Sequence, residues 1–255
     1  MANLASPDLS QRYYAAWWLG KMRVSAGVPA LMIALEDQED RTELGGYPLR
    51  RNAARALGKL GDARAIPSLI QSLDCEDFYV REAAAQAIEQ LAASSKEIHQ
   101  AAEAAIAPLL NLLEVNSLDQ ADYLAQPLEA ILEALGRLQA GAAESKVAEF
   151  LDHPLPRIRF AAARAIYGIS QDPDKQAECG QMLVAGLSNP DLNLRRTVLT
   201  DLGEIGYLPG AGAIAACQVE NSFKLFALKR ILELNLQRAT PESINQIMVY
   251  MDDLL

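Results

Sequence analysis

The segment Asp8–Gly20 gathers large aromatic side chains in a chain whose aromatic content is only 6%. Both tryptophans of the protein, Trp17 and Trp18, follow the adjacent tyrosines Tyr13 and Tyr14. At helical spacing Tyr13 shares a face with Trp17, and the next face carries the other two rings. One pair can enter the core, while the other must face a partner, a ligand or solvent. Because Trp and Tyr combine a flat apolar surface with a polar group, we predict an interface or ligand platform, with oversized core packing as the alternative.

A second group of side chains suited to binding surrounds Tyr47. Arg50, Arg51 and Arg55 follow it closely, and Arg41 precedes it. Arg51 and Arg55 stand four positions apart, so they share a helix face and repel each other. Like charges so placed suit an anion, because guanidinium groups bind carboxylates with two parallel hydrogen bonds. A solvated face is equally compatible with the pattern.

Two further segments combine aromatic and basic residues at the start of a predicted helix. One carries Asp77, Tyr79 and Arg81, and the other carries Arg157 and Arg159. We expect their side chains to line one concave groove of the protein.

The arginines also have a structural interpretation. In a stack of helices, an acidic residue at one helix end can pair with an arginine of the following helix. Asp8 with Arg12, and Asp77 with Arg81, have the spacing for such a ladder. The ladder and the binding of carboxylates on a concave face both remain open for each arginine.

Cysteine and histidine do not form a metal-binding pattern. Cys75, Cys179 and Cys217 lie far apart without a CxxC motif, and His99 and His153 are the histidines of the chain. These residues lack the ligand spacing of a zinc site. We therefore expect reduced thiols in or near helix packing and no metal.

The elements that must position these groups are helices of an internal repeat. In each copy an anchor residue is followed by small or aliphatic residues three and four positions later and by an aliphatic residue seven positions later. These offsets mark one face of an α-helix. The copies begin at Arg12, Arg50, Arg81, Leu128, Arg159, Arg195 and Lys224.

A second helix follows in several copies. Gly61 is expected to end the first helix, and Pro67 lies in the first turn of the second. Gly27 and Pro29 repeat this arrangement. One helical pair cannot bury both apolar faces, whereas stacked pairs can.

The sequence therefore predicts an all-α fold, a HEAT-like or armadillo-type α-solenoid. A single array of about six to seven helical pairs is expected to span residues 1–255. Residues 36–47 are expected to form an insertion loop, and residues 92–104 an extended connection.

Composition excludes several classes of partner. The net charge is −10, which disfavours nucleic acid and anionic membranes because phosphates repel such a surface. No run of apolar residues is long enough to span a bilayer, and no signal peptide opens the chain. We expect a cytoplasmic protein.

Two segments resemble one family specifically. Arg12–Gly20, which contains the string YYAAWW, resembles the signature of E subunits in the E/F-type phycobilin lyases. The segment Arg41–Gly58, with its Gly-Gly-Tyr-Pro-Leu-Arg-Arg-Asn core, is also similar to that family. Members usually carry a helical segment before this point, so the first repeat is expected to lack a cap.

The resemblance implies a cyanobacterial carbon–sulfur lyase of the phycobilisome. An E and an F subunit, both helical-repeat proteins, form a heterodimer that binds phycocyanobilin. The heterodimer attaches this substrate by a thioether to a cysteine of the phycocyanin α subunit. No tightly bound cofactor is implied, and the isomerisation motif Asn-His-Cys-Gln-Gly-Asn of a related F subunit is absent here, as expected for an E subunit.

The residues agree chemically with this function. Arginines suit the two propionates of a bilin, aromatic rings suit its conjugated face, and a carboxylate such as Asp77 is a weak candidate for holding the pyrrole nitrogens. The alternatives are a non-catalytic HEAT-repeat scaffold and a lyase that removes chromophore during phycobilisome turnover.

Overall fold

A computed structural model describes residues 2–114 and 126–255. Over these ranges the chain is helical and contains no strand. The all-α repeat fold predicted from the sequence is confirmed.

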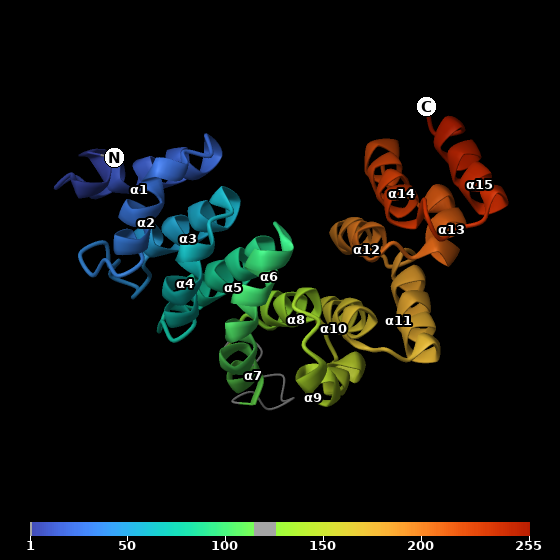
Figure 1. The fold of residues 1–255 in the computed structure, drawn as a ribbon, viewed down its shortest axis with the longest axis horizontal. Helices are drawn as coiled ribbons and strands as arrows, with labels where there is room; N and C mark the ends of the chain where they lie inside the picture. Colours follow the sequence, from blue (N-terminus) through green and yellow to red (C-terminus); the bar gives the residue numbers. More distant parts are fainter. Residues whose placement is uncertain (1, 115–125) are drawn as a thin grey trace. The chain divides into compact units, whose positions relative to one another are not determined.

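The helices follow one another along the chain (Figure 1). In chain order they are α1 (Leu9–Lys21), α2 (Val28–Ala34), α3 (Pro48–Leu60), α4 (Ile66–Ser72), α5 (Phe78–Ala92), α6 (Lys96–Ala102), α7 (Ile106–Glu114), α8 (Leu128–Arg137), α9 (Glu144–Ala148), α10 (Pro156–Ile169), α11 (Pro173–Gly186), α12 (Leu192–Ile205), α13 (Ala211–Ala216), α14 (Asn221–Asn235) and α15 (Pro241–Asp252). Short 3₁₀ turns add η1 (Ala2–Ala5), η2 (Ser25–Gly27), η3 (Ala63–Ala65), η4 (Glu103–Ala105), η5 (Gly141–Ala143), η6 (Glu149–Asp152) and η7 (Leu208–Gly210).

The chain forms two compact units, Met1–Lys146 and Val147–Leu255. In the first unit α1, α3, α5 and α8 pack successively against one another, and α2, α4 and α7 form a second layer against α3, α5 and α8 (Figure 1). In the second unit α12 packs against both α10 and α14, while α11 and α13 cover this row (Figure 1).

The repeated helix face forms the core, as its spacing predicted. Every residue at the third, fourth and seventh positions after an anchor is buried, except the half-buried Ala15. Glycines eight positions after an anchor bring neighbouring helices into close backbone contact. A methyl group added to Gly20 would lie 2.7 Å from Cα of Ala56, and one added to Gly58 would lie 2.8 Å from Cα of Ala87.

The turn within the second repeat follows the sequence prediction, and that of the first repeat follows it only at Pro29, which lies in the first turn of α2. Gly61 ends α3 in the left-handed conformation, with a φ of 68°, and Pro67 lies in the first turn of α4. In the first repeat Gly27 belongs instead to η2 and precedes α2. Arg23, with a φ of 51°, supplies the left-handed residue after α1.

The anchor arginines other than Arg12 bind backbone carbonyls at the end of the preceding repeat. Arg81 donates to the carbonyls of Cys75 and Glu76, at 2.6 and 3.0 Å. The same offsets recur in Arg159, which donates to His153 and Pro154, and in Arg195, which donates to Asn189 and Pro190. The structural role is therefore confirmed for these arginines, but carbonyl oxygens replace the expected carboxylates as acceptors.

Two segments connect the repeats of the first unit. Residues 36–47 link α2 to α3 without a helix, and hydrogen bonds between Thr42 and Gly46 close a turn within them. Residues 92–104 contain α6, so much of this expected connection is itself helical. No helix in the described ranges is both long and apolar enough to cross a bilayer.

Candidate functional site

Helix α1 leaves a large part of its aromatic surface uncovered. The exposed fractions are 65% for Tyr14, 45% for Trp17 and 51% for Trp18, and Tyr13 is half-buried. The prediction that one aromatic pair enters the core is therefore wrong. Packing against α3 instead uses Ala16 and Gly20, since both are buried and Gly20 touches Ala56.

These rings border a hollow that we call the aromatic groove. Its volume is about 550 Å³, and most of its lining is apolar. The lining residues are Asn3, Ser10, Gln11, Tyr14, Ala15, Trp17, Trp18 and Leu19. The ammonium group of Lys21 lies 4.6 Å from the centre of the Trp17 ring, which places a positive charge beside the groove.

A second surface, the arginine–tyrosine face, consists of Arg51, Arg55 and Tyr79. The guanidinium of Arg51 lies over the Tyr79 ring at 5.6 Å, which joins α3 to α5. Nε of Arg51 is buried and has no hydrogen-bond partner in the part of the chain that the structure describes. Arg55 is exposed, and within the described ranges no hydrogen bond or ion pair engages it. These groups can accept an anionic ligand.

Tyr47 and Arg50 do not belong to an exposed platform. Tyr47 is buried, and its hydroxyl donates to Glu76 Oε1 at 2.9 Å. This hydrogen bond raises the pKa of Tyr47 and, together with Arg41, lowers that of Glu76. Arg50 stacks on the Tyr47 ring at 4.2 Å and donates through Nε to the carbonyl of Asp37 at 2.5 Å. Both residues hold the loop before α3 in place.

Asp77, the weak catalytic candidate, caps a helix. Oδ1 accepts a hydrogen bond from the backbone of Tyr79 at 2.8 Å, which caps α5, and Oδ2 accepts from the backbone of Tyr47 at 2.7 Å. Both oxygens are therefore engaged by backbone groups. The predicted Asp77–Arg81 pair is replaced by the bonds of Arg81 to carbonyls and to Gln126 Oε1, at 3.0 Å.

The remaining predicted residues lie at the start of α10, in the second unit. Arg157 is exposed, whereas Arg159 is held by the carbonyls of His153 and Pro154. Burial lowers the pKa of His153, whose ring stacks on Phe150. Arg81 and Arg159 are therefore structural rather than part of an open surface.

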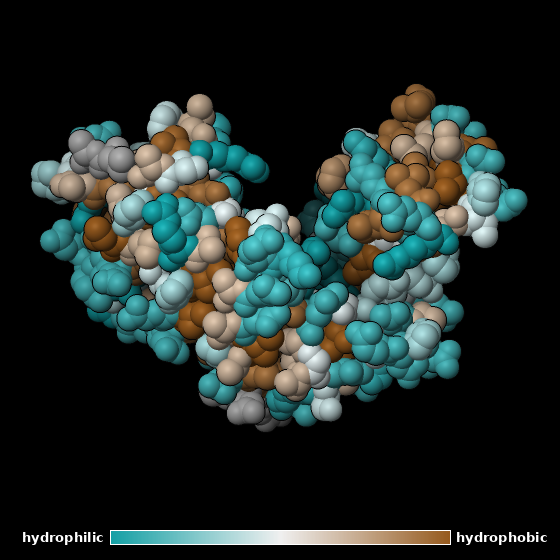
Figure 2. All heavy atoms as spheres, in the orientation of Figure 1, coloured by the Kyte–Doolittle hydropathy of each residue, from teal (hydrophilic) through white to brown (hydrophobic). Residues whose placement is uncertain are grey.

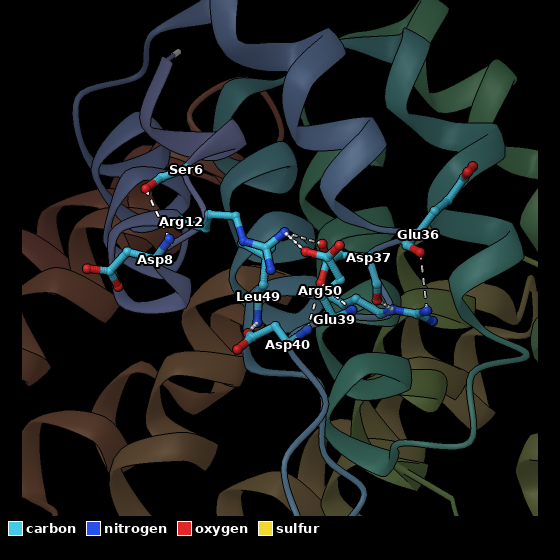
Figure 3. Close-up of polar contacts among 9 residues, drawn as sticks. All are labelled: Ser6, Asp8, Arg12, Glu36, Asp37, Glu39, Asp40, Leu49 and Arg50. Carbon is cyan, nitrogen blue, oxygen red and sulfur yellow. Dashed lines mark hydrogen bonds and ion pairs between the residues drawn. The ribbon is translucent and has the colours of Figure 1, made fainter.

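The acidic partners of Arg12 were not predicted from the sequence. Asp8 caps α1 by accepting from the backbone of Ser10 and Gln11, so its predicted pairing with Arg12 is wrong. Arg12 instead pairs through Nη1 with Asp37 at 2.6 Å and with Glu39 at 3.2 Å (Figure 3). The acidic residues that directly follow α2, from Glu36 to Asp40, are the sequence feature that could have indicated these partners.

Within the described ranges no group of at least three Cys, His, Asp or Glu side chains is arranged to hold a metal ion. Cys179 and Cys217 are buried, and burial raises the pKa of Cys179 to about 11. Neither thiol is suited to act as a nucleophile.

Exposed apolar side chains also gather on α14 and α15 in the second unit. They appear as a brown area over the C-terminal helices in Figure 2. The most exposed members are Phe226, Met248 and Val249, at 62%, 50% and 51%. The repeat pattern did not identify them, because it describes only the buried face of α14.

Comparison with known proteins agrees with this architecture. A family model described as HEAT repeats matches residues 1–89. "Phycocyanobilin lyase subunit alpha" of Nostoc sp. (strain PCC 7120) is 54% identical over 91% of this chain and 82% of its own length. The protein of the same name from Pseudanabaena tenuis is 51% identical over 100% of this chain and 93% of its own length. "Bilin biosynthesis protein PecE" of Nostoc is 42% identical over 100% of this chain and 94% of its own length.

A solved structure matches the fold as well. The complex of CpcE and CpcF of phycocyanin lyase from Nostoc sp. PCC7120 contains a chain that is 53% identical. It superimposes with a TM-score of 0.86, and the match covers 100% of this chain and 92% of that one. On the strength of these identities, the chain belongs to the family of phycocyanobilin lyase alpha subunits.

Proposed function

We propose that this chain is the E-type subunit of a heterodimeric lyase that attaches phycocyanobilin to a cysteine of the phycocyanin α subunit through a thioether. Family membership supports the lyase activity. The relative solved as a complex of CpcE and CpcF supports an F-type subunit as the partner. These names do not favour the non-catalytic scaffold or the chromophore-removing enzyme.

The observation that carries the proposal is the exposed aromatic groove of α1. The side chains of Tyr14, Trp17 and Trp18 are exposed, although burial of such large apolar surfaces would normally stabilise the fold. Their flat surfaces suit the conjugated face of an open-chain tetrapyrrole. The aromatic groove is thus the first contact that we assign to the bilin.

The arginine–tyrosine face supplies complementary charge. Each bilin propionate carries a carboxylate, which an arginine binds with two parallel hydrogen bonds. Arg55 is exposed and, in the described part of the chain, free to do so, and Arg51 lies one helical turn away on the same face of α3. Tyr47, Arg50, Arg81 and Arg159 are engaged within the fold and are left out of this assignment.

The reaction requires positioning rather than a nucleophile from this chain. The acceptor thiolate forms the carbon–sulfur bond at the bilin ethylidene group, and a proton adds to the neighbouring ring carbon. The atoms and electrons of thiol and bilin balance in this addition without an oxidant or a redox cofactor. Holding both reactants at contact distance can itself supply a large part of the rate enhancement.

The test is reconstitution with an F-type subunit, the phycocyanin α apoprotein and phycocyanobilin. Covalent attachment is read as zinc-induced fluorescence of the denatured α subunit. We expect fluorescence only when both lyase subunits are present, and we expect Trp17→Ala with Trp18→Ala to abolish it. Ile33→Ala is the matched control, because Ile33 is 75% exposed on α2 and lies outside the aromatic groove.

Normal ligation by a folded, partner-bound tryptophan variant would refute the role of the aromatic groove. Absence of ligation by the wild-type complex would refute the acceptor or the activity. Release of chromophore from intact phycocyanin would instead identify the chromophore-removing enzyme.

A further inference from the structure

The buried guanidinium of Arg12 joins the helix that carries the aromatic groove to the helix that carries the arginine–tyrosine face. Arg12 is 6% exposed and lies on the side of α1 that faces the loop after α2. We propose that Arg12 is a positioning residue for bilin attachment, which fixes the orientation of α1 relative to α3. This inference rests on the proposed function, because it assigns a role to Arg12 in that reaction.

The connection between α1 and α3 runs through residues 36–47, which we call the acidic loop (Figure 3). Oδ2 of Asp37 accepts a hydrogen bond from Arg12. Oδ1 of Asp37 accepts hydrogen bonds from the backbone N–H groups of Glu39 and Asp40. Asp40 then accepts from the backbone of Leu49 at 2.7 Å, in the first turn of α3. Arg12 is thereby linked to α3 by consecutive short polar contacts.

Arg50 fastens the same loop from the other side. Its Nε donates to the carbonyl of Asp37 and its Nη2 to the carbonyl of Glu36, at 2.5 and 3.3 Å. The loop is therefore held between an arginine of α1 and an arginine of α3. A rotation of α1 about its axis would have to break the Arg12 contacts or move α3 with it.

The bonding of Arg12 is too incomplete to be explained by stability alone. Both carboxylates bind the same nitrogen, Nη1, while Nε and Nη2 are buried and find no hydrogen-bond partner among the described residues. Desolvating a guanidinium whose donors are partly unused is costly, and an apolar side chain of similar size is often as stabilising as a buried ion pair. What an apolar side chain does not provide is a single fixed orientation.

The orientation of α1 matters because the aromatic groove lies on it. Tyr14 and Trp18 move with the helix, whereas Arg51 and Arg55 belong to α3. A ligand that contacts both surfaces senses their relative placement, and a misplacement of about 1 Å can cost a reaction on the order of a hundredfold in rate.

A double variant, Arg12→Met with Asp37→Asn, separates an effect on the orientation of α1 from an effect on folding stability. This pair variant is tested as the full chain with its F-type partner. The amide introduced by Asp37→Asn can still accept the backbone bonds of the loop through its oxygen. We expect the thermal midpoint of this pair variant to stay close to that of the wild type. We also expect kcat for attachment to fall by about tenfold or more and the circular dichroism of the bound bilin to change.

Two further variants complete the comparison. Arg64→Met with Asp62→Asn removes an exposed ion pair from the same unit, and we expect wild-type kcat and bilin spectra. Arg12→Lys retains a single charged nitrogen for Asp37, so we expect it to recover most of the activity. Arg12→Met alone leaves Asp37 without its partner and should lower the thermal midpoint.

Wild-type kcat and bilin spectra in the folded pair variant would overturn the positioning role. Loss of folding in the pair variant would also overturn it, because the ion pair would then act through stability. An inactive wild-type complex would contradict the proposed function itself, which keeps the two failures distinguishable.

Discussion

At the scale of single residues, the acidic loop contains one carboxylate that is stabilised by an ion pair and one that is destabilised by burial. Asp37 faces Arg12 at 2.6 Å. Asp40 lacks such a direct ion pair, and burial, reinforced by the nearby charge of Asp37, raises its pKa above the usual 3.8. The ionised form of Asp40 therefore opposes folding, although the hydrogen bond from the backbone of Leu49 partly stabilises that ionised form.

Asp40→Asn should stabilise the chain at neutral pH by a few tenths of a kcal/mol, since Asn keeps an acceptor for Leu49 and removes the charge. A carboxyl whose pKa is raised by folding binds its proton more tightly in the folded state, so its cost vanishes as pH falls through the raised pKa toward 3.8. Urea unfolding at neutral pH and near pH 4 tests this. We expect the difference from the wild type to shrink at the lower pH, and Asp37→Asn to be destabilising at neutral pH.

Asp77 yields a second prediction at this scale. If its role is to cap α5 and hold Tyr47, Asp77→Asn should keep bilin attachment but lose part of the stability, because its single amide oxygen can replace only one of the two acceptors, Oδ1 and Oδ2. Asp77→Ala should lose about 1–2 kcal/mol of unfolding free energy. A stable Asp77→Asn protein that no longer attaches bilin would restore Asp77 as a catalytic group.

Sequence patterns identified residue types better than residue partners. The tryptophans, Arg51 and Arg55 were recognised from their types and spacing and are exposed or incompletely bonded. The partner of Arg12 could not be predicted, because it depends on the path of the loop between Glu36 and Tyr47. The carbonyl acceptors of Arg81 could not be predicted either, since every residue has a carbonyl and only the fold determines which ones are unpaired.

At the scale of helices, the spacing between α1 and α3 depends on the absence of a side chain. The Cα of Gly20 faces Ala56 so closely that an added methyl group would lie 2.8 Å from Cβ of Ala56. The helical repeat predicted that small residues lie at this interface. It did not predict the exposure of both tryptophans, because the arc of α1 that its neighbours cover depends on how the helices cross.

Gly20→Ala should therefore force α1 away from α3. We expect a loss of about 1–3 kcal/mol in unfolding free energy and a reduced rate of bilin attachment. Gly141→Ala is the matched control, because nothing lies within 4 Å of the methyl group it adds. Chemical denaturation of both variants, followed by attachment assays, tests the contrast, and equal stability of the two would contradict the close approach of α1 and α3.

At the scale of the whole molecule, the fold class followed from the sequence because periodicity reports burial directly. The offsets of three, four and seven positions recur in both units, and the residues they mark are buried in both. The distribution of function was harder to predict. Arg157 and Arg159 repeat the pattern of aromatic and basic residues in the second unit, yet the repeat equally needs an arginine there to bind carbonyls.

The close contacts of Gly20 with Ala56 and of Gly58 with Ala87 have an evolutionary consequence. Residues that set the distances between helices are small and buried, whereas residues assigned to the bilin are large and exposed, and the two sets do not overlap. Substitutions can therefore alter which chromophore or acceptor is recognised while the helix spacing is inherited unchanged. Such a division allows the descendants of one repeat scaffold to diversify in specificity without first having to regain stability.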